Sequence, residues 1–222
     1  MRVSVVIPAL NEAEAIAASI AALPAGADEI VVADGGSDDG TRASAEKAGA
    51  KVISAPRGRG PQMNAGAAAS TGDAIVFLHA DTRLPADAFD LVRGLLANED
   101  VAGGAFHLAI DGHGSFNGPD TGHNWFYAFT ARNANIRSKL LGAPYGDQAF
   151  FVKRPAFDAL AGYKNIPYCE DLDFIRRLRS QGRVIIAPAA VSTSGRRWEK
   201  HGRLAVTIRN GLLFFRFWLG RL

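Results

Sequence analysis

The sequence offers little thiol chemistry and no long apolar segment. Cys169 is the only cysteine among 222 residues, which excludes a disulfide within the chain and a cysteine-based zinc site. This cysteine usage is consistent with a reducing compartment. At the N-terminus, the short apolar stretch after Arg2 ends at Pro8 and is too short for a signal peptide or a membrane span. We therefore expect a cytoplasmic protein.

The net charge of +3 is unevenly distributed. From Arg196 onward the chain has seven basic residues and one acidic residue, Glu199, so this segment carries +6 and the first 195 residues carry −3. A basic tail after a mildly acidic body predicts an anionic partner near the C-terminus, either phosphate groups or an anionic membrane surface. No nucleic-acid-binding motif accompanies the charge, so we expect no nucleic acid partner.

Residues 74–78 form an apolar stretch that is typical of a strand covered on both faces. Polar residues begin at His79. Because side chains alternate along a strand, His79 and Asp81 should project to the same side, just beyond its carboxyl end. Open α/β sheets bind ligands there, and a carboxylate beside an imidazole can hold a divalent cation. The alternative is a polar loop that caps the next helix.

The remaining pattern alternates strands with helices. We expect further strands over 3–8, 29–34, 51–54, 102–110, 148–152, 184–187 and 191–193, and helices over 12–23, 41–48, 61–70, 86–98, 125 to about 134, and about 170–179. Asn11 is the expected N-cap of the first helix. Three strand–helix units in about 70 residues imply parallel, right-handed crossovers, so the predicted class is α/β.

Three other segments have two interpretations each. Arg57 and Arg59 lie between glycines before a helix and suit a phosphate, although a solvated turn is the commoner explanation and the spacing matches neither a Walker loop nor a Rossmann motif. Residues 111–146, rich in Gly, His and aromatic residues, either wall a pocket or simply pack. Glu170, Asp171 and Asp173 either cap a helix or supply a general base.

In this order, these motifs resemble family 2 glycosyltransferases of the nucleotide-sugar-dependent type, which have the GT-A fold. The similarity runs from residues 5–12 to Arg196-Arg197-Trp198, and is greatest to a small bacterial branch with His-Ala-Asp in place of Asp-x-Asp. It implies a GT-A domain over 1–198, with a nucleotide-binding half (1–100), an acceptor and catalytic half (101–198), and a basic amphipathic helix over 199–222.

The resemblance also implies roles for individual residues. The expected nucleotide-binding residues are Pro8, Ala9, Leu10, Glu12, Asp34, Arg59, Gln62, Asn64, His79 and Ala80. Asp81 would ligate a divalent metal, Mn2+ or Mg2+. Asp171, paired with Glu170, would be the catalytic base. Arg196 and Arg197 would steady the leaving diphosphate, and Trp198 would border the acceptor.

Two departures from the family pattern change these expectations. His79 replaces the first aspartate of Asp-x-Asp, which removes a negative charge and lowers the expected metal affinity. Ser194 replaces the glutamine of Gln-x-x-Arg-Trp, which argues against a processive polysaccharide synthase.

The expected activity is metal-dependent transfer of a sugar from a nucleoside-diphosphate sugar to an acceptor hydroxyl, with inversion and Asp171 as base. UDP-sugars are favoured, GDP-sugars stay open, and the acceptor is a lipid, a metabolite or a glycan. The alternatives are a catalytically silent nucleotide-sugar binding protein and a nucleotidyltransferase. The sequence leaves the oligomeric state open.

The tail, residues 204–222, combines apolar residues with arginines. It is too short to span a bilayer but suits an interface, which predicts peripheral association with the inner face of the membrane. Docking on the protein's own core or on a second subunit is an equal alternative.

Overall fold

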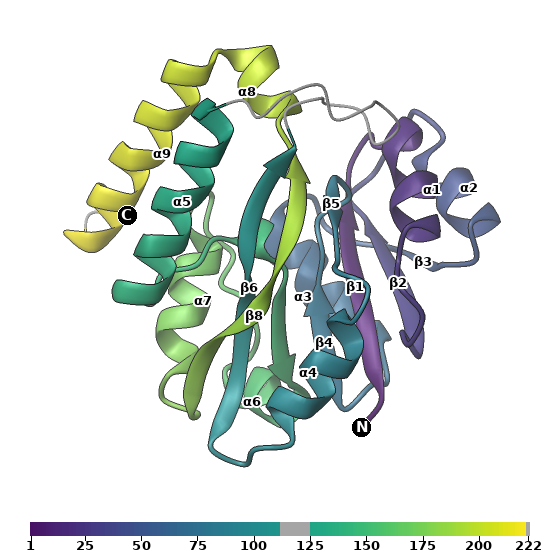
Figure 1. The fold of residues 1–222 in the computed structure, drawn as a ribbon. Coiled ribbons are helices and arrows are strands. Elements are labelled where there is room, and N and C mark those ends of the chain that lie inside the picture. Colours follow the sequence, from purple (N-terminus) through teal and green to yellow (C-terminus); the bar gives the residue numbers. More distant parts are fainter. Residues whose placement is uncertain (112–124, 221–222) are drawn as a thin grey trace.

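The computed structural model describes residues 1–111 and 125–220, and within them eight strands form one sheet with helices on both faces (Figure 1). The order is β3-β2-β1-β4-β7-β6-β8-β5. The strands are β1 Val3–Ala9, β2 Glu29–Asp34, β3 Lys51–Ser54, β4 Ala74–Phe77, β5 Thr82–Arg83, β6 Val101–Asp111, β7 Phe150–Lys153 and β8 Arg183–Ser194. The helices are α1 Ala13–Ala21, α2 Thr41–Lys47, α3 Arg59–Ala69, α4 Ala88–Leu96, α5 Trp125–Leu140, α6 Arg154–Ala159, α7 Glu170–Leu178, α8 Arg196–His201 and α9 Arg203–Trp218, with a 3-10 turn at Gly146–Gln148.

The first half of the chain repeats a strand followed by a helix. β1 pairs in parallel with β2 and β4, and β2 pairs in parallel with β3, as the predicted crossovers require. Alternate residues of β1 serve opposite faces of the sheet. Val5 and Ile7 belong to the same buried cluster as Ile16 of α1, whereas Val6 belongs to the cluster that contains Met63 of α3. Apolar side chains on both faces explain why this strand lies in the centre of the sheet.

The second half of the chain extends the sheet with mixed directions. β7 runs antiparallel to both β4 and β6, β8 runs parallel to β6, and the short β5 pairs antiparallel with β8. The predicted class, an α/β fold with a mostly parallel sheet flanked by helices, is therefore confirmed.

The prediction of two short strands at 184–187 and 191–193 was wrong. The structure has one strand, β8, over Arg183–Ser194, and it contains Pro188. The register with β6 shifts between Ala105, which pairs with Ile186, and His107, which pairs with Ala190. This irregularity absorbs the proline, which cannot donate a ladder hydrogen bond, and pairing continues beyond it.

Two helix predictions also need correction. α5 was expected to end near Ala134 but runs to Leu140, because nothing breaks the helix before Gly142, whose φ of +55° suits a helix end. The tail was expected to be one helix over 199–222. It forms α8 and α9, which are separated by Gly202 with a φ of +83°.

Asn11 is not the N-cap of α1. Glu12 precedes the first helical residue, and Asn11 adopts a left-handed backbone with φ 54°. The backbone N–H of Asn11 donates to Ser37 Oγ at 2.9 Å, and its side-chain Oδ1 accepts the N–H of Asp38 at 3.1 Å. Asn11 therefore joins the loop after β1 to the loop after β2.

Gln148, predicted to begin a strand, lies in the 3-10 turn before β7. Its side chain is fully buried, and its Nε2 donates to the carbonyl of Phe106 at 2.8 Å.

In the described ranges, no helix has both the length and the apolar character needed to cross a membrane.

Candidate functional site

The parallel strands β1, β2 and β4 have their carboxyl ends at the same end of the sheet, and the strand order reverses between β1 and β4. Open α/β sheets bind ligands at such a switch point. A cavity of about 470 Å³ lies beyond the end of β4. Its lining includes Arg57, Arg59, His79, Asp81, Tyr145, Asp147, Tyr168, Glu170, Asp171, Ser194, Arg197, Trp198, Arg209, Asn210 and Leu213.

His79 and Asp81 share this cavity, as the alternation of side chains predicted. Burial, reinforced by the positive charges of Arg59 and Arg197, lowers the pKa of His79 to about 3, so its imidazole is neutral and keeps a lone pair. Burial raises the pKa of Asp81, against the opposing charges of Arg196 and Arg59. The nearest side-chain partner of Asp81 is the Thr82 hydroxyl, at 3.5 Å.

The N-terminus of α7 brings two more carboxylates to the cavity. Asp171 is held by backbone groups, since its Oδ2 accepts the N–H of Gly146 at 2.8 Å and its Oδ1 accepts the N–H of Leu172 at 2.7 Å. Glu170 is 6% exposed and pairs with Arg59 at 4.0 Å. Burial, followed by the charge of Asp171, raises the pKa of Glu170. One carboxylate is therefore oriented, and its neighbour is destabilised as an anion.

Asp147 is a site residue that the sequence analysis missed. It lines the same cavity from the 3-10 turn before β7, and its Oδ1 is buried without a hydrogen-bond partner among the described residues. Burial raises the pKa of Asp147 to about 6; Arg137 opposes the shift, and the charges of Asp171 and Asp81 reinforce it. An acidic residue in a turn beside a predicted strand was the available signal, but the partner strand could not be known.

Four arginines also line the cavity: Arg57, Arg59, Arg197 and Arg209. The pKa of Arg197 is lowered by burial and by the like charges of Arg59 and Arg209. Within the described residues no carboxylate pairs with Arg197 within 4.0 Å. Cations that repel one another in a cavity favour an anionic ligand such as a diphosphate. Arg209, on α9, was not predicted.

Arg196 and Trp198 have different surroundings. Arg196 Nη2 donates to Glu12 Oε2 at 3.0 Å, which joins α8 to the loop after β1. Trp198 is 7% exposed and packs against Tyr127, while its indole N–H has no partner in the described part of the chain. Glu12 therefore holds Arg196, whereas Trp198 lines the cavity with a buried indole N–H.

Of the predicted nucleotide-binding residues, Arg59 and His79 line the cavity. Pro8 and Ala9 end β1, Leu10 follows it, and Ala9 and Ala80 are almost fully buried. Asp34 ends β2, where its carboxylate accepts the N–H groups of Gly36 and Ser37 at 3.2 Å and pairs with Arg42 at 3.5 Å. Burial alone would raise the pKa of Asp34, but these bonds outweigh it and lower the pKa.

Gln62 and Asn64 use their amide groups within the protein. Gln62 Nε2 donates to the carbonyls of Ala9 and Ala33 at 2.7 and 2.9 Å, which fixes the ends of β1 and β2 to α3. Asn64 exchanges two hydrogen bonds of 2.8 Å with the backbone of Tyr163. These bonds give both residues a structural role, and their contact with a nucleotide stays a prediction.

The residues at the cavity fit a cation that is bound together with an anionic ligand. Asp81 supplies a hard oxygen ligand, and the neutral His79 supplies a nitrogen. Across residues 1–111 and 125–220, no three His, Cys, Asp or Glu side chains come close enough to hold a metal by themselves. Magnesium in nucleotide sites usually takes one or two carboxylates and completes its shell with phosphate oxygens and water.

The predicted wall over 111–146 is described only in part, since residues 112–124 lie outside the described ranges.

Comparison with known proteins adds a family match. The model of the family described as "Glycosyl transferase family 2" matches residues 4–159. An uncharacterized glycosyltransferase of Mycobacterium tuberculosis (strain ATCC 25618 / H37Rv) is 42% identical over 90 residues, which are 40% of this chain and 40% of that protein. The glucosyl-3-phosphoglycerate synthase of the same strain is 37% identical over 114 residues, covering 45% of this chain and 35% of the relative. The chain thus matches about two fifths or less of the length of these relatives.

Solved structures share the fold. A crystal structure of glucosyl-3-phosphoglycerate synthase from Mycobacterium tuberculosis in complex with Mn2+, uridine-diphosphate-glucose and phosphoglyceric acid superposes with a TM-score of 0.62. The sequence identity is 24%, and the superposition covers 90% of this chain and 74% of that one. Another crystal structure of that enzyme, in complex with Mg2+ and uridine-diphosphate, has a TM-score of 0.60.

Proposed function

Because the chain belongs to glycosyl transferase family 2, we propose that it transfers a sugar from a nucleoside-diphosphate sugar to the hydroxyl group of an acceptor. The observation that carries this proposal is the composition of one cavity. The oriented carboxylate of Asp171 and the carboxylate of Asp81 line the same cavity as several guanidinium groups, and Arg197 has no carboxylate partner within 4.0 Å among the described residues. Such a cavity suits a substrate with a leaving diphosphate and a hydroxyl that must lose a proton.

Asp171 acts as the general base in this proposal. The backbone N–H groups of Gly146 and Leu172 fix its two oxygens, so one lone pair can point to an acceptor hydroxyl. The hydroxyl proton moves to Asp171 while the hydroxyl oxygen forms a bond to the anomeric carbon. The bond from that carbon to the diphosphate breaks on the opposite face, and the diphosphate leaves with the electron pair. This geometry inverts the anomeric centre.

The arginines stabilise the departing group. Negative charge develops on the diphosphate as the sugar–oxygen bond breaks. The positive charges of Arg59, Arg197 and Arg209, which line the cavity, stabilise it. When bound, Mn2+ or Mg2+ would be held by Asp81 with His79 beside it and would offset further charge on the diphosphate. Trp198, which lines the cavity, borders the acceptor in this proposal.

The donor we propose is a UDP-sugar. Support comes from the glucosyl-3-phosphoglycerate synthase structures with this fold, which contain uridine-diphosphate or uridine-diphosphate-glucose with Mn2+ or Mg2+. The acceptor class stays open between a lipid, a metabolite and a glycan, and phosphoglyceric acid belongs in any panel because the relative binds it. A cytoplasmic location stays a prediction of the sequence.

Calorimetric titration with UDP, GDP and their glucose conjugates, with and without Mn2+, tests this proposal. The wild-type protein should bind UDP in a Mn2+-dependent way, and Asp81→Ala should weaken that binding by at least about tenfold, since metal-bridged charge contacts are worth over 1.4 kcal/mol. Asp90→Ala is the matched control, because Asp90 lies on α4 with 90% of its side chain exposed.

Turnover separates an enzyme from a silent binding protein. Release of UDP from UDP-glucose in the presence of an acceptor panel supports sugar transfer. Metal-dependent binding with no turnover for any donor and acceptor would instead indicate a catalytically silent protein. Tighter binding of GDP than of UDP would overturn the choice of base while leaving the reaction class intact.

A further inference from the structure

Two helices of the second half, α5 and α9, lie side by side at one edge of the molecule (Figure 1). Contacts between them are direct. The guanidinium of Arg203 on α9 lies 5.5 Å from the ring centroid of Phe126 and 5.2 Å from that of Tyr127, both on α5. Arg137 on α5 lies 5.7 Å from the ring centroid of Phe214 on α9. The two helices therefore form one continuous surface element.

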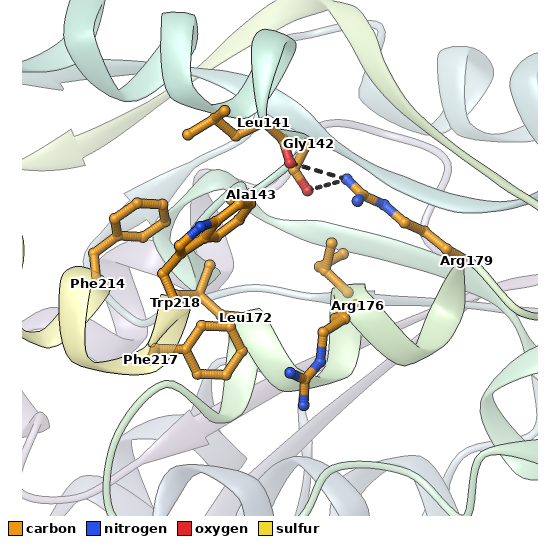
Figure 2. A pocket seen from close by; sticks show the side chains of 10 residues that line it. Leu141, Gly142, Ala143, Leu172, Arg176, Arg179, Phe214, Phe217 and Trp218 are labelled. Atoms are coloured by element: carbon orange, nitrogen blue, oxygen red, sulfur yellow. Dashed lines mark hydrogen bonds between the residues drawn. The ribbon is translucent and has the colours of Figure 1, made fainter. Parts of the chain in front are cut away.

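α9 already has a side that packs on the protein. Val206 is 4% exposed and belongs to a buried cluster with Tyr127 and Trp198. At the other end of the helix, Phe214, Phe217 and Trp218 line a cavity of about 270 Å³ together with Leu172, Arg176 and Arg179 (Figure 2). This side of the helix faces α7 and the end of α5, whereas the apolar residues of the opposite side remain largely exposed.

The outer side of α9 carries a regular apolar stripe. Its members are Leu204, Ile208, Leu212, Phe215 and Leu219, which are 72%, 51%, 59%, 59% and 47% exposed. Steps of four, four, three and four residues keep them on one face of a helix. A contiguous apolar face that is exposed to this extent marks an interaction surface.

α5 carries a second stripe of the same kind. Trp125, Phe129, Ile136 and Leu140 are 76%, 59%, 43% and 75% exposed, and their spacings of four, seven and four residues place them on one face. Phe129 and Leu140 thus stay in water although the helix buries Tyr127, Ala131, Ala134 and Ser138 on its other side.

The charges beside the two stripes have one sign. Neither α5 nor α9 contains an acidic residue, and together they carry Arg132, Arg137, Lys139, Arg203, Arg209 and Arg216. Two copies of such a face would bring like charges together, which disfavours self-association through it. Phosphates of a nucleic acid would gain nothing from exposed leucine and isoleucine. Apolar side chains bordered by cations instead complement lipid tails beneath anionic headgroups.

From this combination we propose that the outer faces of α5 and α9 dock the protein on the surface of an anionic lipid bilayer. The apolar stripes enter the headgroup region while Arg132, Lys139 and Arg216 meet lipid phosphates. α9 also supplies Arg209, Asn210 and Leu213 to the lining of the catalytic cavity, so a bilayer that holds this helix lies next to the site. The proposal concerns binding alone and stands independently of the proposed reaction.

Cosedimentation with vesicles tests it. At low salt, the full chain should pellet with phosphatidylcholine vesicles that contain phosphatidylglycerol. It should pellet less at high salt or with phosphatidylcholine alone, because attraction to anionic headgroups contributes to binding in addition to insertion of apolar side chains. The double variant Leu212→Ser, Phe215→Ser should reduce the fraction bound at least about tenfold, since each buried large apolar side chain is worth more than a tenfold change in partitioning. Both residues are exposed, so the fold should persist.

Charge variants separate docking on this face from general attraction. Lys139→Gln with Arg216→Gln should weaken binding to the anionic vesicles and flatten its salt dependence. The matched control, Lys47→Gln with Arg183→Gln, removes the same charge from exposed positions outside both helices and should bind as the wild type does.

Three results would overturn the proposal. The first is wild-type protein that stays in the supernatant with anionic vesicles at low salt. The second is undiminished pelleting of the Leu212→Ser, Phe215→Ser variant. The third is an equal loss of vesicle binding in the Lys139→Gln, Arg216→Gln variant and in its control. Light scattering gives an independent check, since a wild-type dimer that dissociates in the serine variant would assign the face to a second copy. A donor titration on each variant confirms that the cavity is intact.

Discussion

Helix α7 carries acidic residues into two different surroundings. Asp173 is 3% exposed and surrounded by cations, with Arg177 Nε at 2.7 Å, Arg176 Nη2 at 3.2 Å and Lys164 Nζ at 3.3 Å. Burial would raise the pKa of Asp173, but Arg177 and Lys164 outweigh it and lower the pKa. Two residues earlier, Asp171 lines the cavity and accepts hydrogen bonds from the backbone N–H groups of Gly146 and Leu172.

The difference separates carboxylates that stabilise the fold from carboxylates that are kept for a ligand. The pKa values of Glu170, Asp147 and Asp81 at the cavity are all raised, with burial as the largest cause. An acidic group that is desolvated without a full set of partners costs stability and is typical of functional sites. Asp173 shows what the same helix does when an acid is purely structural.

Asp171→Asn should produce the largest effect in this comparison. The amide keeps the size of the side chain but can accept only one of the two N–H groups that hold Asp171, and it cannot take a proton from an acceptor. We expect kcat to fall about 10²- to 10⁴-fold, the usual contribution of a general base, with the affinity for UDP unchanged and only a small decrease in the melting temperature from the lost hydrogen bond. Steady-state release of UDP and a thermal melt measure both. Turnover near that of the wild type would remove Asp171 from the mechanism.

Asp173→Asn should instead lower stability and leave kcat unchanged. It breaks charged hydrogen bonds at a buried position, so we expect the free energy of unfolding to fall by about 1.5 to 3 kcal/mol while kcat of the folded protein is retained. Because the folded pKa of Asp173 lies below its ordinary value of 3.8, its stabilisation is present above that pH and is lost as the pH falls through the folded pKa. Urea denaturation across this range should show the gap between variant and wild type closing in acid. A gap that is independent of pH would contradict the ion-pair role.

Asp147→Asn should give the smallest effect, and it should raise the free energy of unfolding instead of lowering it. The pKa of Asp147 is raised from 3.8 to about 6, so its contribution to stability is present below 3.8 and is lost as the pH rises toward 6. A neutral amide avoids that loss. We expect the variant to be more stable by about 1 kcal/mol above pH 6, a value discounted for partial exposure, and to equal the wild type in acid.

Thermal melts with a chelator present measure this difference, because a bound cation would mask it. Asp90→Asn, at an exposed position on α4, is the control for loss of one charge. A pH trend shared by the two variants would show that net charge, and not the cavity, causes the effect.

Local patterns in the sequence predicted most of the N-terminal half. The strands at Glu29–Asp34 and Lys51–Ser54 have the predicted bounds, since apolar and β-branched runs there end at turn residues. His79 and Asp81 lie in the short segment between β4 and β5 and line the same cavity, as predicted, because residues so close in the chain need little tertiary information to come together.

Other parts of the site depend on contacts between distant segments. Asp147 reaches the cavity because β7 inserts antiparallel between β4 and β6, and a strand can pair in either direction with the same side-chain pattern. Arg209 reaches it because α9 folds back over α8 after Gly202. Gln62 and Asn64 illustrate the converse, since their polar groups are taken by backbone atoms of β1, β2 and the segment at Tyr163.

Residue types within single short stretches specify the α/β class, the segments at the strand ends that carry Asp34, His79 and Asp81, and the basic, apolar character of the C-terminal segment. Tertiary contacts specify which carboxylates are neutralised, as at Asp173, and which lack a hydrogen-bond partner among the described residues, as at Asp147. They also specify which side of α9 is buried. Burial and charge neutralisation depend on neighbours far along the chain, and a local pattern does not contain this information.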